Sequence, residues 1–155
     1  DGQDHPHRRV HPGLSAPVFD LPQTLKVTRQ RVENEGLEDR IHLQGGNFHV
    51  DAFQGPYDIA LMSDILRYQD GRANAALVEK VYGCLSEGGR LIIKDRFLDP
   101  AKTSPAWTTA FAVHILVNTE CGECFTIQES HQWMEQAGFR MVEELEPRAI
   151  IQGTK

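Results

Sequence analysis

The feature that most constrains the fold is an apolar run followed by a helical segment and a second apolar run. Residues 57–63 (YDIALMS) have the composition of a strand that is buried on both faces of a sheet. Residues 73–85 carry apolar side chains at helical spacing, and the glycines within residues 86–89 end this segment before the apolar residues 90–93. A strand, a helix and a strand in this order predict one unit of a parallel sheet.

The same alternation extends along most of the chain. It predicts further strands at residues 16–20, 40–44, 140–145 and 149–153, and further helices at residues 23–35, 107–117 and 126–137. Thr126 and Glu129 have the spacing of a capping box at the start of the last helix. Strands that alternate with helices predict an α/β fold with a doubly wound, mostly parallel sheet and helices on both of its faces.

Length and charge restrict the class of protein. A chain of 155 residues with 40% hydrophobic side chains is long enough for one core, so residues 1–155 are expected to form a single domain. The net charge of −6 argues against a nucleic-acid partner, because phosphate binding needs a basic surface. No apolar run approaches the roughly 20 residues of a membrane span, and the polar residues 1–10 are unlike a secretory signal. We therefore expect no membrane partner and a cytoplasmic location.

The three cysteines are Cys84, Cys121 and Cys124, an odd number in a chain that can form a core without disulfides. The spacing of Cys121 and Cys124 allows half a zinc site or a redox disulfide. A structural zinc site needs two more ligands, and no second pair at zinc-finger spacing follows. We expect reduced thiols and no bound metal.

Polar residues at the carboxyl ends of the predicted strands are candidates for ligand binding, because doubly wound sheets bind their ligands there. Asp20 ends the first strand, where a carboxylate can accept both hydroxyls of a ribose. Alternatively, Asp20 caps the helix that begins near Leu21. In residues 45–48 (GGNF), the amide of Asn47 can pair with an adenine edge and Phe48 can stack on it. A plain turn with a core phenylalanine explains this segment nearly as well.

Two further groups have both a functional and a purely structural interpretation. Residues 63–70 (SDILRYQD) form a polar cluster after the most apolar strand, as a binding site or a solvated loop would. One face of the predicted helix at residues 107–117 carries apolar and polar side chains. They can belong either to the core or to the wall of a pocket for an aromatic acceptor. These side chains are Trp107, Phe111, His114, Ile115 and Asn118.

Five motifs, in their order and spacing, resemble the small-molecule O-methyltransferases of the caffeate and hydroxyindole type. They are residues 19–22 (FDLP), 46–48 (GNF), 57–63 (YDIALMS), 85–93 (LSEGGRLII) and 136–139 (QAGF), and the similarity covers most of residues 11–155. The resemblance implies a class I methyltransferase (Rossmann-like) fold, S-adenosyl-L-methionine as cofactor, and a small aromatic hydroxyl compound as substrate. It also implies cofactor contacts at Asp20 for the ribose, at Asn47 and Phe48 for the adenine, and at Ser63 near the methionine part, with Leu21 as a further cofactor-binding residue.

The glycine-rich loop that precedes the Asp20 strand in this family has no counterpart in these 155 residues. Residues 1–10 hold one glycine and no apolar strand, and the family's dimerisation domain has no counterpart either. We therefore expect a partial catalytic domain, poorly matched at residues 1–14, that binds the cofactor weakly by itself; a homodimer is left open. The alternative is a non-catalytic relic or interaction module with this fold. A nucleotide-binding module of another doubly wound family is a weaker alternative.

The catalytic base of the family is not retained. Arg67 stands where the family usually has a histidine, and arginine does not release its proton at neutral pH, although it can stabilise a phenolate. Asp95 stands where the family has an acid that orients this histidine, and Cys124 replaces a second such acid. His114 is the substitute candidate for the base, because imidazole titrates near neutral pH. A buried, hydrogen-bonded histidine is the alternative interpretation of His114.

Overall fold

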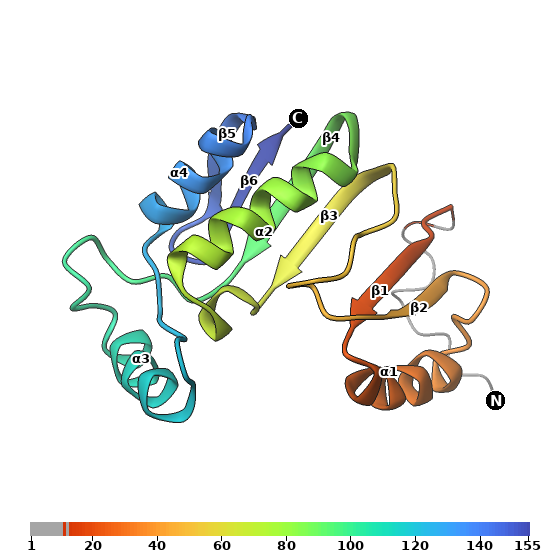
Figure 1. Cartoon of the computed structure of the whole chain (residues 1–155), viewed down its shortest axis with the longest axis horizontal. Coiled ribbons are helices and arrows are strands. Elements are labelled where there is room, and N and C mark those ends of the chain that lie inside the picture. Colours follow the sequence, from red (N-terminus) through yellow and green to blue (C-terminus); the bar gives the residue numbers. More distant parts are fainter. Residues whose placement is uncertain (1–10, 12) are drawn as a thin grey trace. The chain divides into compact units, whose positions relative to one another are not determined.

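The computed structural model describes residue 11 and residues 13–155, so the expectation about residues 1–10 lies outside the described part of the chain. None of the described helices is long and apolar enough to cross a membrane. The chain divides into two compact units, Asp1–Asp51 and Ala52–Lys155, and each is described by itself. Figure 1 labels the helices and strands of both units.

The N-terminal unit consists of a strand, a helix and a strand: β1 (Ala16–Asp20), α1 (Pro22–Asn34) and β2 (Ile41–Gly45). β1 and β2 are parallel neighbours. Pro22 stands in the first turn of α1, where its missing N–H leaves no hydrogen bond unmade. Leu25 and Val32, one helical face, are the buried residues of α1. The three elements lie where the sequence predicts them.

The C-terminal unit holds a four-stranded sheet in the order β3-β4-β6-β5. Its elements are β3 (Tyr57–Ser63), the 3-10 helix η2 (Leu66–Tyr68), α2 (Gly71–Cys84), β4 (Leu85–Lys94), α3 (Ala106–Asn118), α4 (Ile127–Ala137), β5 (Arg140–Glu146) and β6 (Ile150–Thr154). The predicted strand, helix and strand are present as β3, α2 and β4, and the two strands are parallel. The predicted capping box of Thr126 and Glu129 begins α4.

One strand of this sheet, β6, is reversed; the other three run in the same direction, so the sheet is mostly parallel as predicted and departs from a parallel arrangement only at β6. β6 runs antiparallel to both of its neighbours, β4 and β5. Residues 147–149 alone connect β5 to β6. A connection this short joins antiparallel strands, because a parallel pair needs a crossover of roughly a dozen residues or more. The described strands also form two sheets, β1-β2 and this one.

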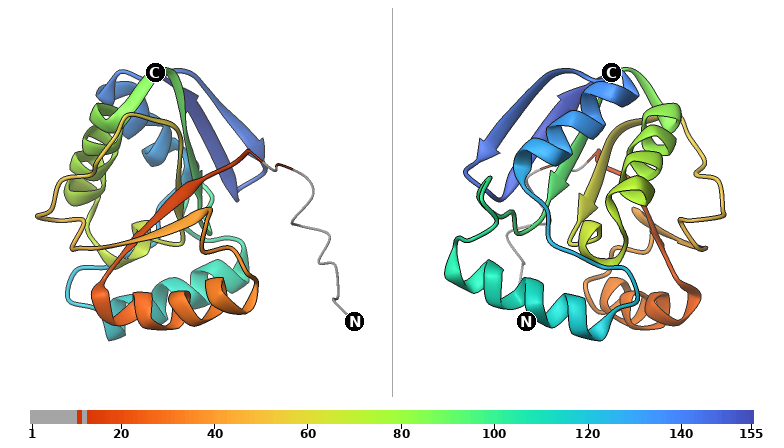
Figure 2. Two further views of the ribbon diagram at one scale, coloured as in Figure 1. Left: turned by 90° about the vertical axis from the view of Figure 1, so that its right-hand side faces the viewer. Right: turned by 60° about the vertical axis from the view of Figure 1, so that its left-hand side comes forward.

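Both helices that pack on the four-stranded sheet cover the same face. α2 and α4 contact one another, and they contact β4, β5 and β6 (Figures 1 and 2). This face contains the core of the unit, where Val78, Met134, Leu91 and Ile93 are fully buried. The prediction of helices on both faces is therefore wrong for this unit.

β3 differs from the prediction of a strand buried on both faces. It forms an edge of the four-stranded sheet, and Met62 on its covered face is buried. Ile59 and Leu61 alternate with Met62 and are 57% and 64% exposed. The physical reason is that side chains alternate between the two faces of a strand, and the helices of this unit cover only one of these faces.

α3 is the least buried helix of the unit. Thr108 and Ile115 are its buried residues, and Phe111 and Ala112 pack against a small cluster of Leu98, Ile115 and Cys124. The exposed large side chains of α3 are Trp107, Val113, Leu116 and Val117. The predicted face of this helix is therefore only partly core.

Candidate functional site

The carboxyl ends of β1 and β2 bring the predicted ribose and adenine residues to one end of the N-terminal unit. Asp20 pairs with Gly45 in the parallel register, and the N–H of Gly46 donates to the carbonyl oxygen of Asp20 at 3.0 Å. Asn47 and Phe48 follow directly in the next turn. This is the proximity that the motif spacing predicts.

Asp20 does not cap α1. The residue at the N-cap position is Leu21, whose side chain forms no capping hydrogen bond. One oxygen of the Asp20 carboxylate, Oδ1, accepts the N–H of Leu21 at 2.7 Å. The other, Oδ2, has no hydrogen-bond partner among the described residues, so it can accept a hydroxyl of a ligand.

The turn after β2 is built around Asn47. Its backbone N–H donates to Asp51 Oδ2 at 2.7 Å, and its side-chain Oδ1 accepts the N–H of His49 at 2.9 Å. The NH₂ group of the Asn47 amide has no hydrogen-bond partner among the described residues. It can therefore donate to an adenine edge. Phe48 is half-buried, and its ring centroid lies 4.4 Å from that of His49.

Gly46 packs closely against the side chain of Phe19 at the start of this turn. A Cβ atom at this position would lie 2.5 Å from the ring of Phe19, closer than carbon atoms approach in proteins. A larger residue at this position would therefore force the Phe19 ring to move.

At the end of β3, the predicted polar cluster contains an ion-pair network. Ser63 is exposed, and its hydroxyl donates to Asp64 Oδ2 at 3.2 Å. The same oxygen accepts from Lys94 Nζ at 2.6 Å, while Arg67 Nη2 donates to Asp64 Oδ1. The cluster is thus more ordered than a solvated loop.

Arg67 lies at the buried end of this network. It is 6% exposed, and its Nη2 also donates to Asp95 Oδ1 at 2.9 Å. Asp95 is 8% exposed and accepts the N–H groups of Leu66 and Arg96 at 3.2 and 2.8 Å. Asp95, predicted to orient a base, therefore orients a buried guanidinium.

Two opposing effects act on the ionisation of this pair. Burial raises the pKa of the Asp95 carboxyl, although the N–H of Arg96 and the charge of Arg67 oppose the shift. Burial disfavours the charged form of Arg67, but the two carboxylates outweigh it and raise the pKa of the guanidinium. Arg67 therefore stays charged and cannot accept a proton from a substrate. Its Nε is buried and has no acceptor among the described atoms.

Asp64 leads to a prediction for acid unfolding. Burial works to raise the pKa of its carboxyl, but the hydrogen bonds from Lys94 and Arg67 prevail and lower the pKa from 3.8 to about 2. Because this pKa is lower in the folded chain, Asp64 adds stability above about pH 4, and the contribution is lost as the pH falls from about 4 to about 2. We expect Asp64→Asn to flatten this part of the curve of unfolding free energy against pH.

Urea unfolding at several pH values in this acid range measures the curve. Asp58→Asn is the matched control, because Asp58 is an exposed carboxylate with no ion pair in the described part of the chain. The control should keep the slope of the parent protein. An unchanged slope in the Asp64→Asn variant would show that the network does not stabilise the fold.

His114 is exposed on α3, so its interpretation as a buried histidine is wrong. Its Nδ1 lies 3.2 Å from Nδ2 of Asn118, and its ring stacks on Phe111 with centroids 6.0 Å apart. Because Nδ2 of asparagine is only a donor, a neutral His114 accepts at Nδ1 and carries its proton on Nε2. The ring can serve as a base only after Asn118 turns away.

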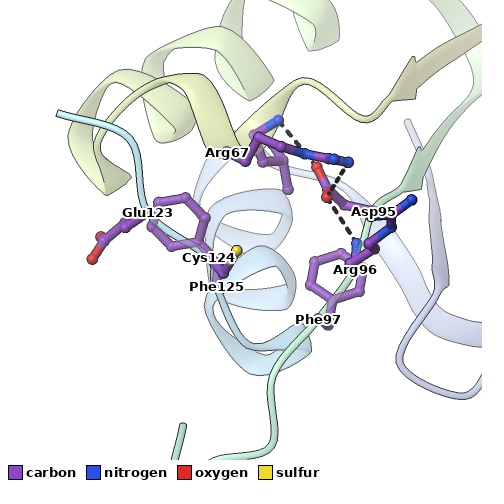
Figure 3. A pocket seen from close by; sticks show the side chains of 8 residues that line it. Arg67, Asp95, Arg96, Phe97, Glu123, Cys124 and Phe125 are labelled. Atoms are coloured by element: carbon purple, nitrogen blue, oxygen red, sulfur yellow. Dashed lines mark hydrogen bonds and ion pairs between the residues drawn. The ribbon is translucent and has the colours of Figure 1, made fainter. Parts of the chain in front are cut away.

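A small crevice, too narrow to admit a water molecule, lies beside the Arg67–Asp95 pair (Figure 3). It is lined by Leu66, Arg67, Asp95, Arg96, Phe97, Glu123, Cys124 and Phe125. Arg96 and Glu123 are not among the site residues predicted from the sequence. Arg96 follows the carboxyl end of β4, and the rule that selects strand ends could have identified it together with Asp95.

The two cysteines of the C-x-x-C spacing differ in their surroundings. Cys121 is exposed, Cys124 is buried, and neither forms a disulfide. Burial, with a contribution from Asp95, raises the pKa of the Cys124 thiol. Among the described residues, no three metal-binding side chains come together. The expectation that the purified protein contains no metal stays a prediction.

Comparison with known proteins identifies the family. The model of the O-methyltransferase domain matches residues 6–140. The chain belongs to the O-methyltransferase family. The match includes residues of both compact units.

Relatives with an assigned activity are longer than this chain. The tetracenomycin polyketide synthesis 8-O-methyl transferase TcmO of Streptomyces glaucescens is 29% identical over 135 residues, which cover 87% of this chain and 39% of that protein. Acetylserotonin O-methyltransferase of Macaca mulatta is 31% identical over 132 residues, which cover 84% of this chain and 37% of that protein. The chain thus spans less than half the length of these relatives.

Solved structures confirm the α/β methyltransferase fold. An O-methyltransferase family 2 protein from Planctomyces limnophilus, solved in complex with apigenin, is 30% identical with a TM-score of 0.87. The match covers 96% of this chain and 45% of that one. PigF, solved with SAH, is 24% identical with a TM-score of 0.87 over 96% of this chain and 45% of its own, and it shares the fold.

Proposed function

We propose that residues 1–155 are part of one S-adenosylmethionine-dependent catalytic domain that methylates a hydroxyl group of a small aromatic compound. One observation carries the proposal: the pairing of Asp20 with Gly45 puts a carboxylate beside the Asn47 turn at the carboxyl ends of two parallel strands. This is the place where doubly wound sheets bind nucleotides. Membership of the O-methyltransferase family supports the same cofactor.

The residues at this end of the N-terminal unit fit the adenosine part of the cofactor. Oδ2 of Asp20 accepts a ribose hydroxyl, with Leu21 holding the carboxylate through its N–H. The amide of Asn47 donates to the adenine edge, and the half-buried Phe48 stacks on the ring. The cofactor supplies a methyl group on a positively charged sulfur. The proposal of Ser63 for the methionine part rests on the family resemblance.

Neither Arg67 nor His114 is free to accept the proton of a substrate hydroxyl, and the catalytic roles that we assign follow from this. Arg67 is held as a cation by Asp95, and His114 uses its acceptor nitrogen for Asn118. We assign Arg67 the role of stabilising the acceptor oxygen electrostatically. Asp95 positions Arg67, and His114 serves as an auxiliary base. Methyl transfer then depends mainly on alignment and on an acceptor that arrives ionised. Hydroxyl groups of acidic phenols suit such a site.

The names of the relatives support an aromatic acceptor. One relative is an acetylserotonin O-methyltransferase, one is an 8-O-methyl transferase of polyketide synthesis, and one was solved with apigenin. The exposed aromatic side chain of Trp107 and the half-buried ring of Phe111 on α3 provide a surface on which a flat ring can stack.

The test of the proposal is the binding of S-adenosylhomocysteine at millimolar concentration, followed by NMR of the labelled chain. We expect signals of residues 20 and 45–48 to shift, and Asp20→Asn to weaken binding about 5-fold or more, because the variant loses a charged acceptor for the ribose hydroxyl. Asp39→Asn, at an exposed carboxylate of the same unit, should bind like the parent chain. Equal binding by both variants, or shifts confined to other residues, would contradict the cofactor site.

The alternative, a non-catalytic module that retains the fold, is favoured by one observation. Neither Arg67 nor His114 has a free acceptor for the proton of a substrate hydroxyl. The two functions differ in an assay of methyl transfer from labelled cofactor to phenols of graded acidity. A catalytic domain transfers the label and prefers acidic phenols, whereas a relic transfers none.

A further inference from the structure

Arg96 has an unusual position just beyond the carboxyl end of β4. Its side chain is exposed, and its guanidinium carbon lies 5.0 Å from the ring centroid of Phe111 and 5.8 Å from that of Trp107. Both rings belong to α3, and Trp107 is 68% exposed. One cation and two aromatic rings therefore form a surface that is open to solvent. We call these three residues the Arg96–aromatic surface.

The charge of Arg96 is not neutralised within the described part of the chain. The neighbouring Arg67, whose guanidinium also lies 5.0 Å from the Phe111 ring, is paired with both Asp64 and Asp95. No carboxylate lies within ion-pair distance of Arg96 among the described residues. Of the two cations that contact Phe111, Arg96 is the one available to an external anion.

Arginine in this setting suits a particular ligand chemistry. A guanidinium that stacks on aromatic rings keeps its N–H groups in its own plane, where they can donate two parallel hydrogen bonds to a carboxylate. The exposed ring of Trp107 provides a flat apolar surface beside these donors. The combination recognises a flat aromatic ring that carries a negatively charged substituent.

We propose that Arg96 is a specificity-determining residue that selects aromatic acceptors with a carboxylate substituent, held on the Arg96–aromatic surface. The proposal rests on the proposed O-methyltransferase function, because it names the acceptor class for that reaction. Arg96 does not take part in methyl transfer itself. It binds the substituent and so orients the ring, while the reacting hydroxyl lies elsewhere on the same molecule.

An acidic side chain near the crevice does not cancel this selectivity. Glu123 lines the same crevice as Arg96, but Figure 3 shows the two side chains pointing away from one another. The buried Asp95 accepts its hydrogen bonds from Arg67 and from backbone N–H groups. Both carboxylates are therefore directed away from the guanidinium of Arg96.

A binding experiment with the full chain tests the proposal independently of methyl transfer. Naphthoate is titrated into the labelled protein, and naphthamide, its neutral analogue of the same shape, is titrated in parallel. The indole N–H signal of Trp107 reports binding, and that of Trp133, which is 9% exposed, serves as internal control. We expect naphthoate to bind about fivefold more tightly than naphthamide, as one exposed ion pair allows, and to shift the Trp107 signal alone.

Arg96→Gln should abolish the preference for naphthoate and leave naphthamide binding unchanged. Arg90→Gln is the matched control, because Arg90 is an exposed arginine on β4, the strand that Arg96 follows. Equal binding of the two ligands, a preference that survives in Arg96→Gln, or no shift of the Trp107 signal would each overturn the proposal. Asp20→Asn removes a cofactor contact in the other unit and should not affect the naphthoate titration. A loss of cofactor binding and a loss of anion selectivity are thus distinguishable.

Discussion

A polypeptide limited to these 155 residues should bind S-adenosylmethionine at least ~10-fold more weakly than a family member with a complete site, a difference of about 1.4 kcal/mol. Three of the residues proposed for the cofactor, Asp20, Asn47 and Phe48, belong to its adenosine end, and only Ser63 is proposed for the methionine end. In the fold that the chain resembles, a glycine-rich turn brings backbone N–H groups and a helix N-terminus to the other end of the cofactor. No described segment provides such a turn next to Asp20.

The exposed edge of β3 supports this expectation. β3 pairs with β4 on one side, and the structure describes no strand on its other side. Ile59 and Leu61 are 57% and 64% exposed. Backbone groups on an unpaired edge need other partners, and each one buried without a partner costs about 1–3 kcal/mol.

Isothermal titration with S-adenosylhomocysteine measures the affinity. The Planctomyces limnophilus relative, measured under the same conditions, provides the reference for a longer member of the family. The NMR spectrum of the 155-residue chain must first show a folded protein. Micromolar or tighter binding by this chain would overturn the prediction, and it would mean that residues 1–10 or a second copy rebuild the missing turn.

Arg67→Met should lower the free energy of unfolding by about 3–5 kcal/mol at neutral pH. The side chains of Arg67 and Asp95 are each 7% exposed, so the substitution leaves a buried carboxylate without its cation. Asp64 loses a partner at the same time, but Lys94 remains beside it at 2.6 Å. The loss of unfolding free energy should be smaller at acid pH. Burial raises the pKa of Asp95, so its carboxylate takes up a proton there, and protonation removes the uncompensated charge.

Urea unfolding monitored by fluorescence measures this loss. Lys94→Met is the matched control, because the side chain of Lys94 is 51% exposed and an exposed ion pair contributes about 1 kcal/mol or less. Introducing Asp95→Asn into the Arg67→Met variant should restore part of the stability, since the buried group is then uncharged. A loss below about 1 kcal/mol in Arg67→Met would show that the pair is solvated in solution.

The local sequence determined the elements and their order. The capping box of Thr126 and Glu129 and Pro22 at the start of α1 act within one turn of the chain, so their effects can be predicted without knowing the fold. The same holds for the proximity of Asp20 and Asn47. Two parallel strands that begin in register also end together, and the motif spacing contains this information. The predicted end of α2 at the glycines of residues 86–89 is wrong, because the helix ends at Cys84 and these glycines lie within β4.

The tertiary structure alone decided what covers each side chain and which groups pair. Apolar periodicity records which residues can be buried, but not whether a second layer lies over them. Ile59 and Leu61 are therefore exposed, although they belong to a mainly apolar strand. Arg67 and Asp95 are 28 positions apart, and they meet because β3 and β4 are parallel neighbours that end at the same edge. The sequence identified both as candidate catalytic residues. Their mutual ion pair, and with it the loss of a free base, is a consequence of long-range packing that no local pattern contains.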